Sequence, residues 1–158
     1  EELDGPVAVR YPRGSQGDYS ADNSRGSSVI LRVGKDITLI GYGVEINELL
    51  LAAGLLAERG IEAEVIKLNQ IAPLDAAPVV ESVRRTGAML SAEECAAMGC
   101  VGSQLLAALE AAGVEAKTAV ATCGEGFVTH GNSSELKKML GLDGESLFRR
   151  AMEVLGRG

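Results

Sequence analysis

Two arginines near the amino terminus have the spacing expected of an anion-binding site. Arg10 and Arg13 lie in the segment RYPRG (10–14), where Pro12 and Gly14 disfavour a helix. A guanidinium binds phosphate or carboxylate through two parallel hydrogen bonds, so the pair could hold one anionic ligand. Two structural salt bridges would use the same side chains, and composition alone favours that interpretation.

The other candidates for acid–base chemistry are the single histidine and a pair of glutamates. His130 lies in a predicted loop, where it could exchange a proton near neutral pH or anchor the loop by hydrogen bonds. Glu93 and Glu94 follow a predicted strand, at the sheet end where α/β folds carry their sites. For these two glutamates, helix capping and interface hydrogen bonds are favoured over catalysis.

Two weaker patterns have plainer structural explanations. The segment Gly41-Tyr-Gly43 resembles a phosphate cradle but lacks its third glycine, so a tight turn from strand to helix is the better interpretation. The cysteines Cys95, Cys100 and Cys123 are too scattered for a zinc ribbon, even with His130 added. They are predicted to be reduced, small and largely buried, and no metal site is predicted.

Short β-branched runs alternate with helical patterns from position 29 onward. Helices are predicted over 44–59, 76–85 with Asp75 as N-cap, 101–112 before Gly113, 135–140 with Ser133 or Ser134 as N-cap, and beyond Asp143. The strand candidates are Val29–Val33, Ile37–Gly41, Glu64–Leu68, Ala88–Ser91 and Thr118–Ala121.

This alternation predicts an α/β fold, a three-layer αβα sandwich around a mostly parallel sheet of about five strands. The first two strands, separated only by Gly34-Lys-Asp36, are interpreted as a hairpin, which makes the first strand antiparallel to the rest. Aromatic residues are only 3% of the chain, so aliphatic side chains must build the core.

Composition also limits the partners. The net charge of −7 and the lack of any basic run argue against nucleic acid, and no apolar run reaches membrane-spanning length. Without a signal peptide, a cytoplasmic location is expected. The polar Gly/Ser-rich stretch 15–28 is interpreted as a linker, which leaves 1–14 as the tail of a preceding domain and 29–158 as the main domain.

Six motifs occur together in register along almost the whole chain. They are GPVAVRYPRG (5–14), GKDITLIGYG (34–43), PLD (73–75), Glu93-Glu94 followed by Gly99 and Gly102-Ser103, FVTHG (127–131) and GLD (141–143). In this order and spacing the chain resembles the C-terminal domain of 1-deoxy-D-xylulose-5-phosphate synthases, a family of transketolase-type thiamine diphosphate enzymes.

The resemblance implies an activity that belongs to a larger parent enzyme. Such enzymes condense pyruvate with glyceraldehyde 3-phosphate with loss of CO2, act as homodimers, and hold thiamine diphosphate and Mg²⁺ in the two domains preceding this one, the second of which binds the pyrimidine ring. It also implies that Arg13 contacts the phosphate of the acceptor, with Arg10 in support. The chain contains no Gly-Asp-Gly followed by Asn for the magnesium and diphosphate. The fragment alone is therefore predicted to be inactive.

The same observations leave two alternatives open. One is the C-terminal part of a transketolase or of the β subunit of a 2-oxo acid dehydrogenase, against which the RYPRG segment argues. The other is a stand-alone α/β binding domain with a site beside Gly41-Tyr-Gly43.

Overall fold

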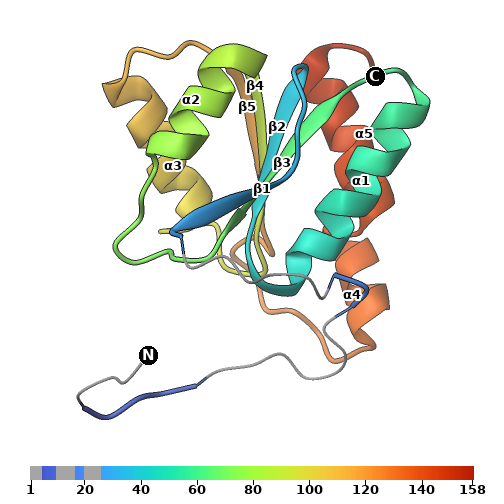
Figure 1. Ribbon diagram of the computed structural model, residues 1–158. Helices are drawn as coiled ribbons and strands as arrows, with labels where there is room; N and C mark the ends of the chain where they lie inside the picture. Colours follow the sequence, from blue (N-terminus) through green and yellow to red (C-terminus); the bar gives the residue numbers. More distant parts are fainter. Residues whose placement is uncertain (1–4, 10–16, 20–25) are drawn as a thin grey trace.

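A computed structural model, which describes residues 5–9, 17–19 and 26–158, has a five-stranded sheet at its centre (Figure 1). The strand order is β1-β3-β2-β4-β5, and only β1 is antiparallel to its neighbour. The strands are β1 (Ser28–Arg32), β2 (Ile37–Gly41), β3 (Ala63–Leu68), β4 (Ala88–Ala92) and β5 (Lys117–Ala121). The predicted fold class is confirmed.

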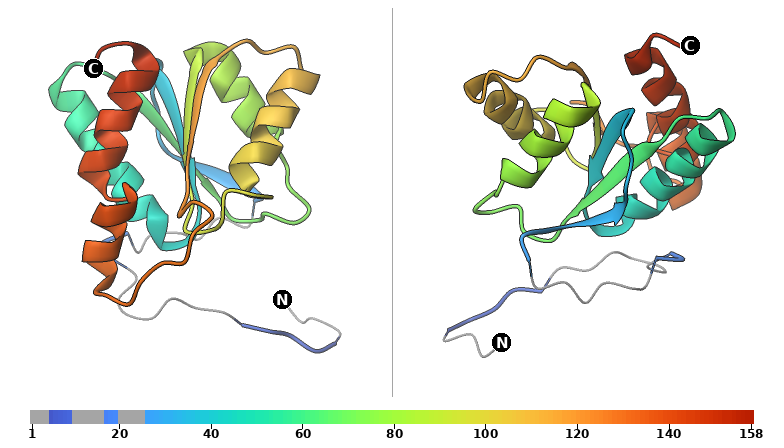
Figure 2. Two further views of the ribbon diagram at one scale, coloured as in Figure 1. Left: turned by 180° about the vertical axis from the view of Figure 1, so that it is seen from behind. Right: turned by 45° about the horizontal axis from the view of Figure 1, so that its top comes forward.

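Helices cover both faces of the sheet (Figure 2). One face carries α1 (Ile46–Glu58) and α5 (Gly144–Leu155), and the other carries α2 (Ala77–Thr86) and α3 (Val101–Ala111). The short helix α4 (Ser133–Leu140) has no fully buried residue. Within the described ranges, no helix is both long and apolar enough to cross a membrane.

Burial explains the order of the strands. Every residue of β2 and β4 is buried, and all but one residue of β3 are, because these strands have neighbours on both sides and helices on both faces. Such strands are largely apolar, as is typical of parallel sheets, and Thr38, Glu64 and Ser91 are their buried polar or charged exceptions. The half-exposed strands β1 and β5 form the two edges.

The predicted hairpin between the first two strands is wrong, although the antiparallel direction of β1 is confirmed. β1 pairs with β3, and β2 lies on the other side of β3. The connection carries the chain around the start of β3, because the amides of Lys35 and Asp36 both donate to the Glu62 carbonyl, at 2.9 and 3.0 Å. Gly34 permits this path, since a Cβ there would lie only 2.2 Å from the Ala63 backbone.

Two predicted helix starts also need correction. The N-cap of α2 is Ala76, although Asp75 Oδ1 accepts a hydrogen bond from the Ala77 amide at 3.2 Å. The N-cap of α4 is Asn132, whose Oδ1 accepts from the Ser134 amide at 3.0 Å. Asp143 caps α5 as predicted. Asparagine and serine cap helices by the same geometry, so sequence alone does not separate adjacent candidates.

The parallel strands all end on one side of the molecule, which we call the carboxyl end of the sheet (Figure 1). The chain leaves β2 toward α1 on one face and leaves β3 toward α2 on the other, so the strand order reverses between β2 and β4. Such a reversal opens a crevice beyond the strand ends, which is where open α/β sheets most often carry their sites.

Candidate functional site

The structure locates three of the five predicted site residues. Arg10 and Arg13 lie outside the described residues. Glu93 and Glu94 follow β4 at the carboxyl end of the sheet, and His130 is exposed in the loop before α4. In the described part of the chain, no hydrogen bond or ion pair joins His130 to either glutamate or to any other residue.

Glu93 is a buried carboxylate that caps helix α3. Its side chain accepts hydrogen bonds from the amides of Val101 (Oε2, 2.9 Å) and Gly102 (Oε1, 2.6 Å). The positive end of the helix dipole compensates the buried charge. A Cβ at position 102 would lie 2.4 Å from Ser91 Oγ and 3.0 Å from Glu93 Oε1, so this approach requires a glycine.

Tyr42 and Cys95 lie beside this carboxylate. The Tyr42 hydroxyl donates to Glu93 Oε2 at 3.2 Å, and the Cys95 thiol lies 3.6 Å from the same oxygen. Burial, helped by the neighbouring carboxylate, raises the pKa of Tyr42 and raises the pKa of Cys95 to about 11. Both groups therefore stay protonated at neutral pH, and Cys95 is no nucleophile there.

These residues line a pocket of about 440 Å³ at the strand reversal between β2 and β4. The rest of the lining is mainly apolar or small, and includes Ile71, Met98 and Cys100. Because the Glu93 carboxylate already accepts from the first amides of α3, these amides are not free to bind a phosphate.

A second ionic cluster, which the sequence did not indicate, surrounds Lys137 of α4. Lys137 Nζ lies 2.9 Å from Glu45 Oε2, 3.1 Å from Glu94 Oε1 and 3.5 Å from Glu48 Oε1. Glu48 also accepts the Gly144 amide at 2.9 Å, which ties α1 to the start of α5. The cluster joins α1, the loop after β4 and α4.

Glu45 is the member of this cluster whose charge is least favourably buried. It is 1% exposed, and its Oε1 has no hydrogen-bond partner in the described part of the chain. Burial raises the pKa of Glu45 to about 7, and the ion pair with Lys137 offsets only part of that rise. Burial alone would lower the pKa of Lys137, but its ion pairs with Glu45 and Glu94 raise it overall.

Glu45→Gln should therefore stabilise the protein at pH 8 and have little effect near pH 4.5. The folded pKa of about 7 exceeds the ordinary glutamate pKa of 4.5, so the unfolding free energy of the wild type falls as the pH rises between these two values. We expect a gain of about 1–3 kcal/mol at pH 8. Denaturant unfolding at several pH values measures it.

The exposed Glu58 at the end of the same helix supplies the matched control. Glu58→Gln should keep the pH profile of the wild type. The groups facing Glu45 are Glu48, Glu94, Lys137 and the Cys123 thiol. A Glu45→Gln profile parallel to that of the wild type would assign the pH dependence to one of these instead.

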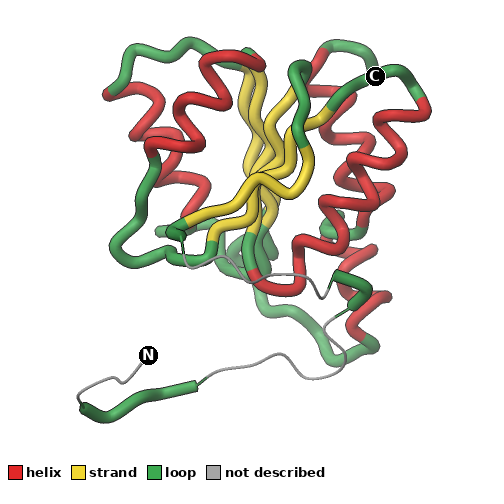
Figure 3. Tube along the Cα trace, viewed as in Figure 1, coloured by secondary structure: helices red, strands yellow, loops and turns green. Residues whose placement is uncertain are grey.

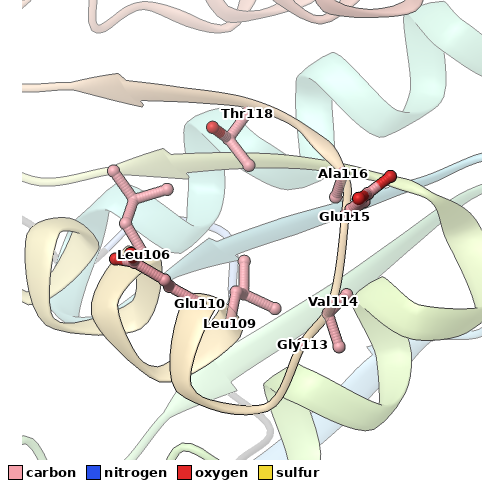
Figure 4. A pocket seen from close by; sticks show the side chains of 8 residues that line it. All are labelled: Leu106, Leu109, Glu110, Gly113, Val114, Glu115, Ala116 and Thr118. Carbon is pink, nitrogen blue, oxygen red and sulfur yellow. The ribbon is translucent and has the colours of Figure 1, made fainter.

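A second hollow lies at the opposite end of the sheet and carries no chemistry that we can assign. Its lining comes from α3, the following loop and the start of β5, as Figure 4 shows. Leu106, Leu109 and Val114 supply its apolar surface, and the charged groups that line it among the described residues are the carboxylates of Glu110 and Glu115. In the described part of the chain, no cation lines this hollow that could hold a phosphorylated substrate.

The described residues do not fit the magnesium and diphosphate that the resemblance implies for the parent enzyme. No group of three His, Cys, Asp or Glu side chains in this part of the chain could hold a metal ion. The Glu93 carboxylate, at the α3 terminus in the strand reversal, would repel a diphosphate. We therefore assign no catalytic step to these residues.

The fold and the site thus define an αβα domain whose buried charges serve structure. A family model of the transketolase C-terminal domain matches residues 26–147, and the chain belongs to that family.

Relatives in two enzyme classes cover nearly the whole chain. The 1-deoxy-D-xylulose-5-phosphate synthase of Gloeobacter violaceus is 34% identical over 96% of this chain, and one from Geobacter sulfurreducens is 38% identical over 89%. The chain spans only 25% and 23% of those proteins. A 6-deoxy-6-sulfo-D-fructose transketolase subunit from Clostridium sp. (strain MSTE9) is 34% identical over 98% of this chain, which spans 48% of it.

Solved structures agree on the fold. A split-gene transketolase, solved as an inactive β4 tetramer, superimposes with a TM-score of 0.74 at 26% identity, over 92% of this chain and 47% of its own. A transketolase from Pichia stipitis gives a TM-score of 0.58 at 20% identity, over 82% of this chain and 18% of its own. The second likeness concerns the fold alone.

Proposed function

We propose that this chain is the C-terminal domain of a 1-deoxy-D-xylulose-5-phosphate synthase. The parent enzyme joins pyruvate to glyceraldehyde 3-phosphate with loss of CO2, using thiamine diphosphate and Mg²⁺ held by the preceding domains of a homodimer. The observation that carries this proposal is the 33–38% identity to such synthases along most of the chain.

This domain contributes binding and interfaces rather than chemistry. The buried carboxylate of Glu93 is saturated by protein donors, so it is not free to act on a substrate. The site residue of this chain is Arg13, with Arg10 in support, because the acceptor carries a phosphate that a guanidinium can clamp. Glu94 and His130 are exposed enough to lie at interfaces with other domains.

The division of the chain follows the same proposal. Residues 1–14 form the tail of the preceding pyrimidine-binding domain, 15–28 form a linker, and 29–158 form the C-terminal domain. The exposed apolar side chains of Val7 and Val9 support it, because a strand removed from its own sheet would leave them uncovered. The family match, which begins at residue 26, supports the later boundary.

A second candidate is the C-terminal part of a transketolase, a class that includes the split-gene β4 structure and the Clostridium subunit. The likenesses to those two proteins favour it. The two candidates differ in the donor substrate, since a synthase decarboxylates pyruvate and a transketolase takes a ketol unit from a ketose.

The full-length protein should form 1-deoxy-D-xylulose 5-phosphate from pyruvate and glyceraldehyde 3-phosphate and should release CO2. The 158-residue chain, assayed with thiamine diphosphate and Mg²⁺, should neither decarboxylate pyruvate nor show saturable cofactor binding by calorimetry. Transfer from a ketose without use of pyruvate would favour the transketolase. Micromolar cofactor binding by the chain alone would contradict the proposal that the preceding domains hold the cofactor.

A further inference from the structure

We infer that the preceding domains of the full-length protein dock on the carboxyl end of the sheet, over an apolar rim formed by Ile71, Met98, Phe127 and Val128. The inference rests on the proposed function, because it takes the occupant to be the thiamine-binding part of the same polypeptide. Neither the family match nor the relatives assign an interface to these residues.

The rim exposes large apolar side chains that a soluble domain normally buries. Met98 is 84% exposed, Phe127 is fully exposed, and Ile71 and Val128 are each about two-fifths exposed. They come from the loops that follow β3, β4 and β5, which gather at the carboxyl end of the sheet (Figure 3). Large apolar side chains exposed on loops that lie together mark interaction sites.

Backbone contacts make these loops one surface. The Cys123 amide donates to the Cys95 carbonyl at 2.9 Å, and the Ala97 amide lies 3.3 Å from the Gly124 carbonyl, so the loops after β4 and β5 are joined. Ile71 and Met98 in turn line the same pocket at the strand reversal. The loops after β4 and β5 are thereby joined before any partner arrives, which lowers the entropic cost of docking.

The chain also enters the domain at this end. The Tyr19 amide donates to Asn47 Oδ1 at 2.9 Å, and Lys67 Nζ lies 5.3 Å from the centre of the Tyr19 ring. Asn47 is in the first turn of α1, which follows β2, and Lys67 is near the end of β3. Residues 17–19 thus lie beside the start of α1 in Figure 1.

The contacts of Tyr19 with Asn47 and Lys67 favour a preceding domain of the same polypeptide as the partner that covers the rim. The proposed preceding domain ends at residue 14, so five residues separate it from Tyr19, a reach of at most about 18 Å when fully extended. A preceding domain tethered there has a high effective concentration at the rim. A second copy of this chain has no such tether.

Hydroxyl-radical footprinting of the full-length protein, read by mass spectrometry, tests the inference. Labelling of Met98 and Phe127 should fall toward that of Met89, which is fully buried in β4. Val33 is 81% exposed beside the edge strand β1, away from the rim, and should stay labelled. Met98 labelled as readily in the full-length protein as in the 158-residue chain would overturn the inference.

Introducing charges on the rim supplies a second measurement. Met98→Glu with Phe127→Glu should restore labelling of Ile71 in the full-length protein, because a carboxylate resists burial in a dry interface. The matched control Val33→Glu should leave Ile71 protected. Exposure of Ile71 in the unsubstituted protein would overturn the inference whatever the variants do.

Two outcomes separate this inference from the proposed function. A full-length protein that binds thiamine diphosphate but leaves the rim labelled overturns the docking surface alone. One that binds no thiamine diphosphate overturns the proposed function, and with it the identity of the occupant. Protection that disappears on dilution, as dimers dissociate, would assign the rim to a second copy and overturn the inference.

Discussion

In the full-length protein, Arg13→Ala should raise KM for glyceraldehyde 3-phosphate far more than KM for pyruvate. Only the acceptor carries a phosphate for the guanidinium to bind. Loss of a charge-assisted hydrogen bond costs about 1.5–3 kcal/mol, or roughly ten- to over a hundredfold in kcat/KM for the acceptor. Steady-state kinetics with each substrate varied in turn measures the difference.

Conservative and matched variants sharpen this test. Arg13→Lys should recover only part of the loss, because an ammonium keeps the charge but lacks the bidentate fork. Arg25→Ala, which removes an arginine from the proposed linker, should leave both KM values near those of the wild type. Equal effects of Arg13→Ala on the two substrates would instead make Arg13 a structural residue.

The fold could be predicted because buried strands appear in the sequence as short runs of mainly apolar residues. The apolar runs Ile37–Gly41 and Ala88–Ser91 became the fully buried strands β2 and β4, the second one residue longer than predicted. The pairing of β1 was not predictable by the same means. A three-residue connection suits a hairpin, but here the contacts of Lys35 and Asp36 with Glu62 lead the chain past β3, and those contacts are distant in sequence.

The candidate site was likewise predictable only in part. Glu93 could be singled out because it follows a strand at the end of the sheet where sites gather, and the structure places it on the α3 terminus. No pattern in the sequence predicted the ionic cluster around Lys137. Its carboxylates, on Glu45, Glu48 and Glu94, come from segments up to 92 residues away from Lys137, so no local spacing marks them.

Glu93→Gln should lower the free energy of unfolding by about 2–3 kcal/mol, and the melting temperature by roughly 5–10 °C. The carboxylate accepts from the Val101 and Gly102 amides with different oxygens. Glutamine has one acceptor oxygen, and its NH2 group would face the second amide, which is left without a partner inside the protein. Thermal and denaturant unfolding of the 158-residue chain measure the loss.

The neighbouring glutamate is the matched control. Glu94 has a 43% exposed side chain and loses only its ion pair with Lys137, so Glu94→Gln should cost less than about 1 kcal/mol. Gly102→Ala tests the same contact by changing the helix instead of the carboxylate, because the added Cβ would crowd Ser91 Oγ and Glu93 Oε1. Wild-type stability in both Glu93→Gln and Gly102→Ala would mean that the α3 terminus does not depend on this carboxylate.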